Sequence, residues 1–587
     1  TASGGGSWYE YRQKMCALGF SFEYSATFAQ SAAKHENLRQ TYTKAILFDY
    51  SYRHFYGDGY GKQSQILNLH KNPNSEDEYR YLVASLLTYY QQLRLYDDQK
   101  KALEPFNLER PLWVFVSSKV TASLSPGEAS DTVQVLLFVD QVLHKADKTK
   151  DAIDYLLSKG MVSQGGTDLL YNRFNYLKEL GEATEALYFD ILSRVFHSTG
   201  GRLHIENITG VAGEIALRAG SSDTPFGVIN VGDDSKLIKL CEKHDLYTQD
   251  ARFSESLFRQ INDESSSVNL LLGSKKFTEG WSSWRVSNMT LMNVGKNEGA
   301  QIIQLFGRGV RLKGWQTSLK RSAELSVGLR SANVERPKHI GTLETLNIFG
   351  VKADYIAQFR KELEEEEIPV NEGLEEFVLP LKPMANLPQD LNVIRVKSAV
   401  AGKAIGGSGT AFLELAEQVV LKSPSLLTSS ERDYFCNPPR VVLDFYPNVN
   451  MFATDKSGKR ESGRSSASLS VLHVALLDMQ SLYFELLAFK RAKRWSNFTI
   501  TQDSIEALLS DNSWYTLYAP KEAMALGSLE RLSLWNDMAA ALLKKYCEMF
   551  YGLRRRQWES DKLEYRSITE NSKYLPGVRE DTPEGSY

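Results

Sequence analysis

The sequence predicts an α/β protein that has a parallel sheet with helices on both faces, followed by a mixed α+β accessory domain. Between Leu203 and Leu291, short apolar runs alternate with segments of helical periodicity, which is typical of a parallel sheet covered on both faces. After Pro111, the run LWVFVSSKV is rich in aromatic and β-branched residues and favours a buried strand. After about residue 345 this alternation ends, and a Pro- and Gly-rich passage follows.

The elements before Pro111 are expected from short local patterns. We expect a helix over Tyr9–Leu18 and strands over Phe22–Thr27 and Ala45–Phe48. A long helix is expected over Glu76–Glu104, because apolar residues recur there at helical spacing.

The later elements follow the same two periodicities. The expected helical segments are residues 132–143, 151–195, 234–244, 353–367 and 529–559. The expected strands are residues 203–208, 226–232, 268–274, 289–294 and 441–445.

The composition is that of a globular chain rather than a disordered or fibrous one. Of the 587 residues, 42% are hydrophobic and 24% are charged, which suits about three or four compact units. The formal net charge of −3 neither requires nor excludes a nucleic-acid partner. No run approaches the roughly 18 apolar residues of a membrane span, and the four cysteines lie far apart. We therefore expect no membrane partner, no structural zinc, and a reduced, cytoplasmic compartment.

The residues richest in chemistry lie in QIIQLFGRGVRLKG, residues 301–314. Gln304, Gly307, Arg308 and Arg311 form the pattern Q-x-x-G-R-x-x-R. Arginines three residues apart share one face of a helix, so two guanidinium groups can meet one triphosphate, and the glycine allows backbone to approach phosphate closely. The pattern resembles motif VI of superfamily 2 helicases (DEAD/DEAH-type). For this segment alone, the alternative interpretation is a basic surface helix.

Three further segments resemble motifs of the same family in the family's order. LLGSKKFTEGWSSW is similar to motif V, which implies that Ser274 and Lys275 contact nucleic acid and that Gly280 contacts the nucleotide. The family usually has an acidic residue two positions after this glycine, where this chain has Ser282. Ser25-Ala-Thr27 resembles motif III, and LWVFVSSKV, which contains Ser117, resembles motif IV.

The group that the chain resembles comprises the helicase subunits of type III restriction enzymes and related bacterial anti-phage defence helicases. The resemblance implies a RecA-like sheet and an ATP-dependent helicase or translocase. It implies domains at 1–105 (end of a first RecA-like domain), 106–345 (second RecA-like domain with a helical insertion) and 346–587 (accessory domain). It also implies the following roles: Arg308 and Arg311 on the γ-phosphate, Gln304 near the attacking water, Gly280 and Gly307 at the nucleotide, Ser117, Ser274 and Lys275 on the strand backbone, and Ser25 and Thr27 in coupling.

The sequence contains no G-x-x-x-x-G-K-[ST] phosphate loop and no acidic Walker B box. We therefore expect the phosphate-loop lysine and the Mg²⁺ ligands to lie in an N-terminal portion before Thr1, and this chain alone to be inactive. The expected cofactors of the intact protein are ATP and Mg²⁺. DNA is the expected nucleic acid, with RNA left open, and a nuclease or effector subunit of a defence complex is a further expected partner.

Charge distribution supports a polyanionic partner, and two rival functions stay open. Residues 301–340 contain eight Arg or Lys against two Glu. Residues 490–495 and 554–558 interleave cations with aromatic residues, as single-strand grooves do, although ordinary helix ends share this pattern. One rival is a nucleic-acid-binding scaffold with a RecA-like fold and no turnover. The other is a restriction nuclease, but no carboxylate–carboxylate–lysine cluster stands out after residue 370.

Overall fold

The computed structural model describes residues 11–12, 14–24, 47–48, 50, 52–69, 75–117, 130–164, 166–251, 256–273, 281–292, 299–325, 328–329, 332–351, 392–397, 399–400, 403–404, 412–413, 416–447, 449–453, 460–461, 463–526 and 531–567. Contacts divide the chain into two compact units. Unit 1 comprises residues 1–373 and 447–462, and unit 2 comprises residues 374–446 and 463–587. Each unit has a hydrophobic core of its own.

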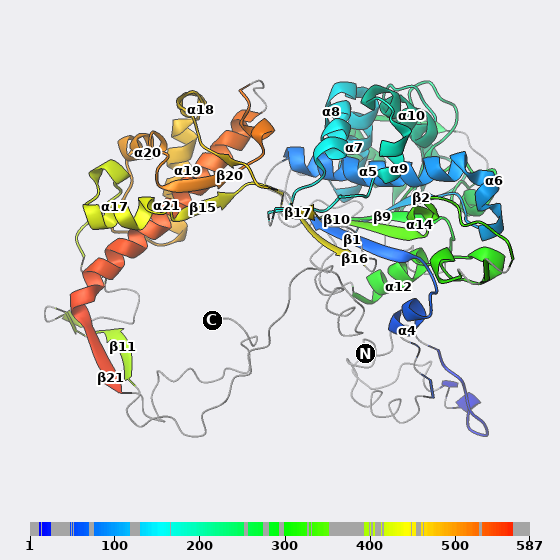
Figure 1. The fold of residues 1–587 in the computed structure, drawn as a ribbon, viewed down its shortest axis with the longest axis horizontal. Coiled ribbons are helices and arrows are strands. Elements are labelled where there is room, and N and C mark those ends of the chain that lie inside the picture. The colour runs from blue at the N-terminus through cyan, green and yellow to red at the C-terminus, as the bar shows by residue number, and fades with distance from the viewer. Residues whose placement is uncertain are drawn as a thin grey trace. The chain divides into compact units, whose positions relative to one another are not determined.

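Unit 1 is built around a ten-stranded, mostly parallel sheet in the described part of the chain (Figure 1). The strands lie in the order β16 (Val449–Ala453), β1 (Gln63–Leu69), β10 (Thr345–Val351), β9 (Val286–Met292), β2 (Leu112–Ser117), β8 (Leu270–Gly273), β6 (Gly227–Asn230), β5 (Glu214–Ala219), β4 (Leu203–Ile208) and β7 (Tyr247–Ala251). Six strands that are neighbours in the sheet run parallel to one another: β1, β10, β9, β2, β8 and β6. Strand β16 pairs antiparallel with β1, and β5 pairs antiparallel with both β6 and β4.

Helices cover both faces of this sheet. Figure 1 shows one layer on the upper face and α12 (Gly299–Gly309) below the sheet. The upper layer contains α5 (Ser75–Asp98), α7 (Asp131–His144), α8 (Ala146–Lys159), α9 (Asn175–Leu180) and α10 (Thr184–Phe196).

Alternate side chains of β2 enter different cores. Trp113 and Phe115 pack with the upper helices, while Leu112 and Val114 pack with the core that contains Leu305 of α12. Successive side chains of a strand point to opposite faces, so a strand buried on both faces is apolar throughout. This is why the run after Pro111 could be interpreted correctly, and the α/β prediction is confirmed.

The boundary expected at residue 105 does not divide the described structure. Strand β1 pairs with β10, and α5 packs on the same sheet, so both belong to unit 1. The expected long helix is interrupted after Asp98, and a short helix, α6 (Lys100–Leu103), continues the segment. Pro105 lies in the 3-10 turn Glu104–Phe106 that follows. At the other end, β10 carries unit 1 beyond residue 345.

Two expected strands near the N-terminus are wrong in the parts that the structure describes. Residues 22–24 and 47–48 have no strand structure. Phe22 is 65% exposed and Phe48 is 80% exposed. No strand of the described chain pairs with these residues, so their local β propensity has no sheet to join.

Unit 2 is a mixed α and β unit whose core surrounds one long helix, α21 (Leu532–Glu559). Its other helices are α17 (Ser429–Cys436), α18 (Val471–Leu476), α19 (Met479–Ala492) and α20 (Gln502–Leu509). A three-stranded sheet has the order β15 (Val441–Asp444), β20 (Tyr515–Tyr518) and β18 (Ser466–Ala467). Trp514, Trp535 and Tyr546 are almost fully buried in this core.

Smaller two-stranded pairings complete the described chain. They are β11 (Asn392–Val396) with β21 (Leu563–Ser567), β12 (Ala399–Val400) with β13 (Lys403–Ala404), β14 (Val419–Val420) with β19 (Phe498–Thr499), and β17 (Arg460–Glu461) with β3 (Thr167–Asp168). None of the described helices is both long and apolar enough to cross a lipid bilayer.

Candidate functional site

The arginine motif lies on α12 and the turn that follows it. Leu305, Phe306 and Val310 are buried against the lower face of the sheet, whereas Gln304 on the same helix is exposed. The helix therefore forms because its apolar residues recur at helical spacing and have a sheet face to cover. Its C-terminal end lies where the parallel strands begin, since the Val310 carbonyl accepts a hydrogen bond from the Lys62 backbone N–H at 2.7 Å, just before β1.

Both motif arginines contact the loop that leads into β9. The Arg308 guanidinium donates to the Trp281 carbonyl, and the Arg311 guanidinium donates to the Ser282 hydroxyl. Burial lowers the pKa of Arg308, and the positive charge of Arg311 lowers it further. The two guanidinium groups are thus near enough for each to feel the other's charge.

Arg311, like Arg308 and Arg285, has a neutral partner. Within the described part of the chain it forms no ion pair. Its neighbour Lys313 is paired with Glu109. Because no described carboxylate forms an ion pair with the Arg311 guanidinium, the described part of the site retains a positive charge that an anion could neutralise.

Close packing requires a glycine at position 309, not at the motif position 307. A Cβ atom added to Gly307 would meet no atom within 4 Å, and this residue is exposed. A Cβ atom on Gly309 would lie 2.8 Å from both the Leu346 side chain of β10 and the Met289 side chain of β9. Gly309 therefore lets the end of α12 sit directly on the sheet, while Gly307 leaves the backbone open on the outer side.

A small polar cavity of about 10 Å³ lies at this amino edge and is lined by Arg311, Lys313, Lys62, Arg285 and Glu109, among others. It has room for about one water molecule. Lys62 is buried and donates to the Val286 carbonyl, and burial lowers its pKa to about 8.

Arg285 anchors the same edge from within. Its guanidinium donates to the carbonyls of Arg110 at 3.0 Å and Val268 at 2.8 Å, and also to that of Ile261. Burial lowers its pKa to about 10. These bonds fix the residues that enter β2, β8 and β9, so the loop that carries Ser282 starts from a rigid base.

The structure brings some predicted site residues together and separates others. Ser117 ends β2 at the carboxyl edge of the sheet, where its hydroxyl donates to Asp131 at 2.8 Å, and both residues are buried. Register pairs Leu112 with Val286 and Ser117 with Met292, so the strand length of roughly 17 Å separates Ser117 from the arginine edge. Ser25, Thr27, Ser274, Lys275 and Gly280 lie outside the described residues.

Lys62 and Arg285 were missed by sequence interpretation. Lys62 follows two glycines with positive φ, Gly59 and Gly61, and directly precedes β1. A basic residue between a glycine turn and an apolar run is a usable signal, but β1 itself was not recognised. Arg285 gives no comparable signal, because its role depends on carbonyls distant in sequence.

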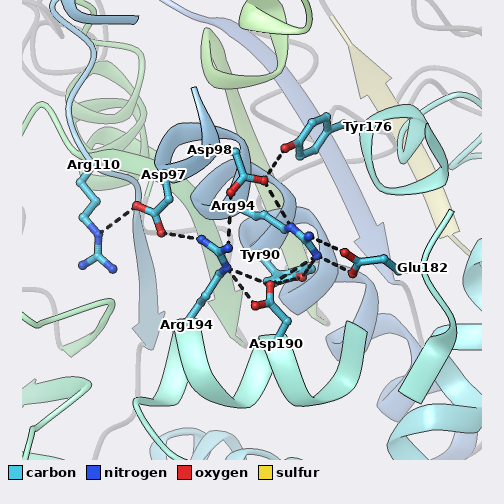
Figure 2. A network of polar contacts seen from close by, with 9 residues as sticks. All are labelled: Tyr90, Arg94, Asp97, Asp98, Arg110, Tyr176, Glu182, Asp190 and Arg194. Carbon is cyan, nitrogen blue, oxygen red and sulfur yellow. Dashed lines mark hydrogen bonds and ion pairs between the residues drawn. The ribbon is translucent and has the colours of Figure 1, made fainter. Parts of the chain in front are cut away.

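A second polar cluster in unit 1 joins α5 to the α9–α10 region (Figure 2). Arg94 donates to both carboxylate oxygens of Glu182, at 2.7 and 2.6 Å, and Arg194 donates to Asp190 at 2.8 Å. Tyr90 donates to Asp190 and Tyr176 to Asp98, each at 2.6 Å.

In this cluster each carboxylate has a cationic partner. The hydrogen bond from Arg94 lowers the pKa of Glu182, while burial and the bond to Asp190 raise the pKa of Tyr90. Asp97 also lies 3.9 Å from Arg110, which precedes β2. A carboxylate already held by a guanidinium is a poor general base, so we interpret this cluster as a structural connection between the helical layer and the sheet.

Comparison with protein-family models, with curated proteins and with solved structures finds no match, so any family assignment rests on the motif residues themselves.

Proposed function

We propose that this chain is part of a cytoplasmic, ATP-dependent nucleic-acid helicase or translocase of superfamily 2, of the kind found in bacterial restriction and anti-phage defence. DNA is the proposed substrate, and RNA is the alternative. The observation that carries the proposal is Arg311, a motif arginine whose partner is the neutral Ser282 hydroxyl. The six parallel strands with helices on both faces support a RecA-like assignment.

In this proposal, Arg308 and Arg311 leave the loop before β9 and contact phosphate oxygens of ATP presented by another RecA-like domain. A guanidinium fork matches phosphate geometry and stabilises the charge that develops during phosphoryl transfer. Gln304 is exposed on the same helix and would orient the attacking water. ATP itself supplies the free energy of the conformational cycle.

The nucleic-acid strand would lie at the opposite edge of the sheet, near Ser117, and the motif also assigns Ser274 and Lys275 to its backbone. Ser117 would have to exchange Asp131 for a phosphate oxygen, so its contribution to binding should be small. Among the described residues, no three His, Cys, Asp or Glu side chains gather to hold a metal ion. Because the sequence contains no G-x-x-x-x-G-K-[ST] loop, the proposal has the other RecA-like domain supply the phosphate loop and the Mg²⁺ ligands.

ATP hydrolysis by the full-length protein, with and without DNA, tests the proposal. Arg311→Ala should lower kcat by about 10² or more while changing nucleotide affinity much less, because such an arginine acts mainly in the transition state. Arg311→Lys should stay impaired, since an ammonium cannot span two phosphate oxygens. The matched control is Lys239→Ala, an exposed cation on α11 (Asp234–Lys243), which should turn over normally.

The result that would overturn the proposal is turnover near the wild-type rate in both Arg311 variants. The rival function, a scaffold without turnover, is favoured by the Ser282 hydroxyl in place of the family's usual acidic residue. It predicts that the full-length protein binds DNA but shows no DNA-stimulated hydrolysis. Hydrolysis that requires Arg311 excludes it.

A further inference from the structure

The C-terminal half of α21 in unit 2 carries a row of cations. Lys545 and Arg556 are both exposed and lie eleven residues apart, which is three helical turns, so they share one face of α21 about 17 Å apart. Lys545 donates to the Val442 carbonyl of β15 at 2.6 Å, and Arg556 donates to the Tyr434 hydroxyl at 2.7 Å. The segment from α17 to β15 thus runs beside this face.

A third cation lies beside the Arg556 end of this row. The Arg440 guanidinium lies 5.1 Å from the centre of the Tyr434 ring, and that of Arg556 lies 5.5 Å from it. The tyrosine therefore holds both arginines by its ring and its hydroxyl, which reduces the entropy that they would lose on binding a ligand. We call Arg440, Lys545 and Arg556, with Tyr434, the α21 cationic row.

Most carboxylates near the α21 cationic row form ion pairs with arginines outside the row. Glu431 is buried, accepts the backbone N–H of Thr428 at 2.9 Å and pairs with Arg554 at 2.6 Å. Glu559 pairs with Arg555 at 2.7 Å. Asp433 is exposed on α17 beside Tyr434 and is the one acidic neighbour without such a role in the described structure.

Within the described chain, the three cations of the row form no ion pair with a carboxylate. Their partners among the described residues are neutral: a carbonyl, a hydroxyl and an aromatic ring. A positive row of this kind is complementary to a ligand with regularly repeated negative charge.

The nearby tryptophans do not offer faces for base stacking. Trp495 stacks on Tyr551 with ring centres 4.4 Å apart. Trp558 has Phe412 against it at 5.7 Å and the Lys562 ammonium over its ring at 4.5 Å. The sequence pattern suggested a groove in which cations alternate with stacking aromatics, but these rings belong to the core of unit 2 or are already covered.

We propose that the α21 cationic row binds the phosphodiester backbone of nucleic acid, through charge and without reading bases. Cations spaced along a line suit consecutive phosphates, and the lack of an open aromatic face predicts indifference to sequence. This surface belongs to unit 2 and requires no nucleotide, so it does not depend on the helicase proposal.

The experiment measures binding of the chain to labelled 20-nucleotide DNA, single- and double-stranded, at 50–200 mM salt and without ATP. Arg440→Gln combined with Lys545→Gln should weaken binding about tenfold. It should also flatten the slope of log K against log salt by about 1.4 on single strands, two phosphate contacts at roughly 0.7 each. Two oligonucleotides of unrelated sequence should lose affinity equally.

The matched control is Lys521→Gln. Lys521 is exposed in the 3-10 helix Lys521–Met524, whose Ala523 carbonyl accepts from Trp535, about 30 Å along α21 from Arg556. This variant should keep wild-type affinity and slope. Because the assay contains no ATP, a failure here is distinguishable from a failure of the proposed function, which is tested by ATP hydrolysis.

Unchanged affinity and salt slope in the double variant, with an unchanged thermal unfolding curve, would overturn the proposal. Arg440→Gln alone keeps the test valid if the double variant unfolds, and it should flatten the slope by about 0.7. Equal competition by poly-glutamate at matched charge would also overturn it, and would assign the row to an acidic protein instead.

Discussion

Two sets of arginines in unit 1 have opposite surroundings. In the cluster of Figure 2, Arg94 and Arg194 are held by carboxylates from several elements. At the amino edge of the sheet, the side-chain partner of Arg311 within the described residues is the neutral Ser282 hydroxyl. In the first arrangement, ion pairs with carboxylates neutralise the arginines and connect the helices. In the second, the positive charge stays available for a ligand. The motif arginine thus differs from a structural one in its partners, and Arg94 is also the more deeply buried of the two.

The largest expected effect comes from removing a cation of the Figure 2 cluster. The Arg94 side chain is 10% exposed and is ion-paired with Asp98, Glu182 and Asp190. Arg94→Met would leave these carboxylates close together with less neutralising charge, and should lower the free energy of unfolding by about 3 kcal/mol. Chemical denaturation at pH 7 measures this.

The same substitution at the other site is the matched comparison. Arg311→Met removes a bond to one neutral hydroxyl, so unfolding should change by less than about 1 kcal/mol. Equal losses of unfolding free energy in the two variants would show that Arg311 is as important for stability as Arg94.

The second prediction concerns Lys62, whose buried ammonium shares the cavity with Arg285, Arg311, Lys313 and Glu109. Burial lowers its pKa from 10.5 to about 8. Between these values the unfolded chain holds a proton that the folded chain has released, so stability rises with pH through this window. At pH 7 both states are protonated, and the folded state bears the full penalty of a buried charge.

Lys62→Met removes that penalty. The variant's advantage over wild type should therefore shrink by about 2 kcal/mol between pH 7 and pH 9.5, while the other titrating groups cancel between the two proteins. Parallel denaturant titrations at several pH values measure it. A difference that does not change with pH would show that the Lys62 ammonium is as well solvated as a surface lysine.

Burial on both faces did not by itself make a strand of unit 1 predictable from the sequence. The run at Leu112–Ser117 is apolar throughout and was recognised, whereas β1 and β5 contain polar residues and were not. The residue pattern within one β-strand also does not reveal how that strand pairs. Strand β5 runs antiparallel to both of its neighbours, and nothing local in EIALRA indicates this.

For the candidate site, the spacing predicted that Arg308 and Arg311 share one face of a helix, but α12 ends at Gly309 and Arg311 lies in the loop after it. The spacing also did not reveal what the two arginines touch. Their partners, Trp281 and Ser282, lie 27 and 29 residues earlier. The buried partners of the edge, Lys62 and Arg285, come from segments that only the folded sheet brings together. Prediction of such a site from sequence is therefore limited by contacts between residues that are distant in the chain, which residue type does not reveal.

The smallest expected effect distinguishes the two glycines of α12. Gly307 is exposed, and an added methyl group meets nothing within 4 Å, so Gly307→Ala should stabilise the helix by about 0.5–1 kcal/mol. Gly309→Ala gains the same propensity but pushes a methyl group against buried Leu346 and Met289. Overpacking typically costs about 1–3 kcal/mol, so the net change should be a loss of about 1 kcal/mol.

Stability changes of opposite sign at positions 307 and 309 would fix the orientation of α12 on the sheet. They would also fix the side from which Arg308 and Arg311 approach the loop before β9. Thermal unfolding of both variants in parallel gives the sign directly. If both substitutions stabilised the protein, α12 would not be seated against β9 and β10, and the exposed face that carries Gln304 and Gly307 would lose its assignment. If both destabilised it, the backbone at Gly307 would be in close contact with another part of the protein.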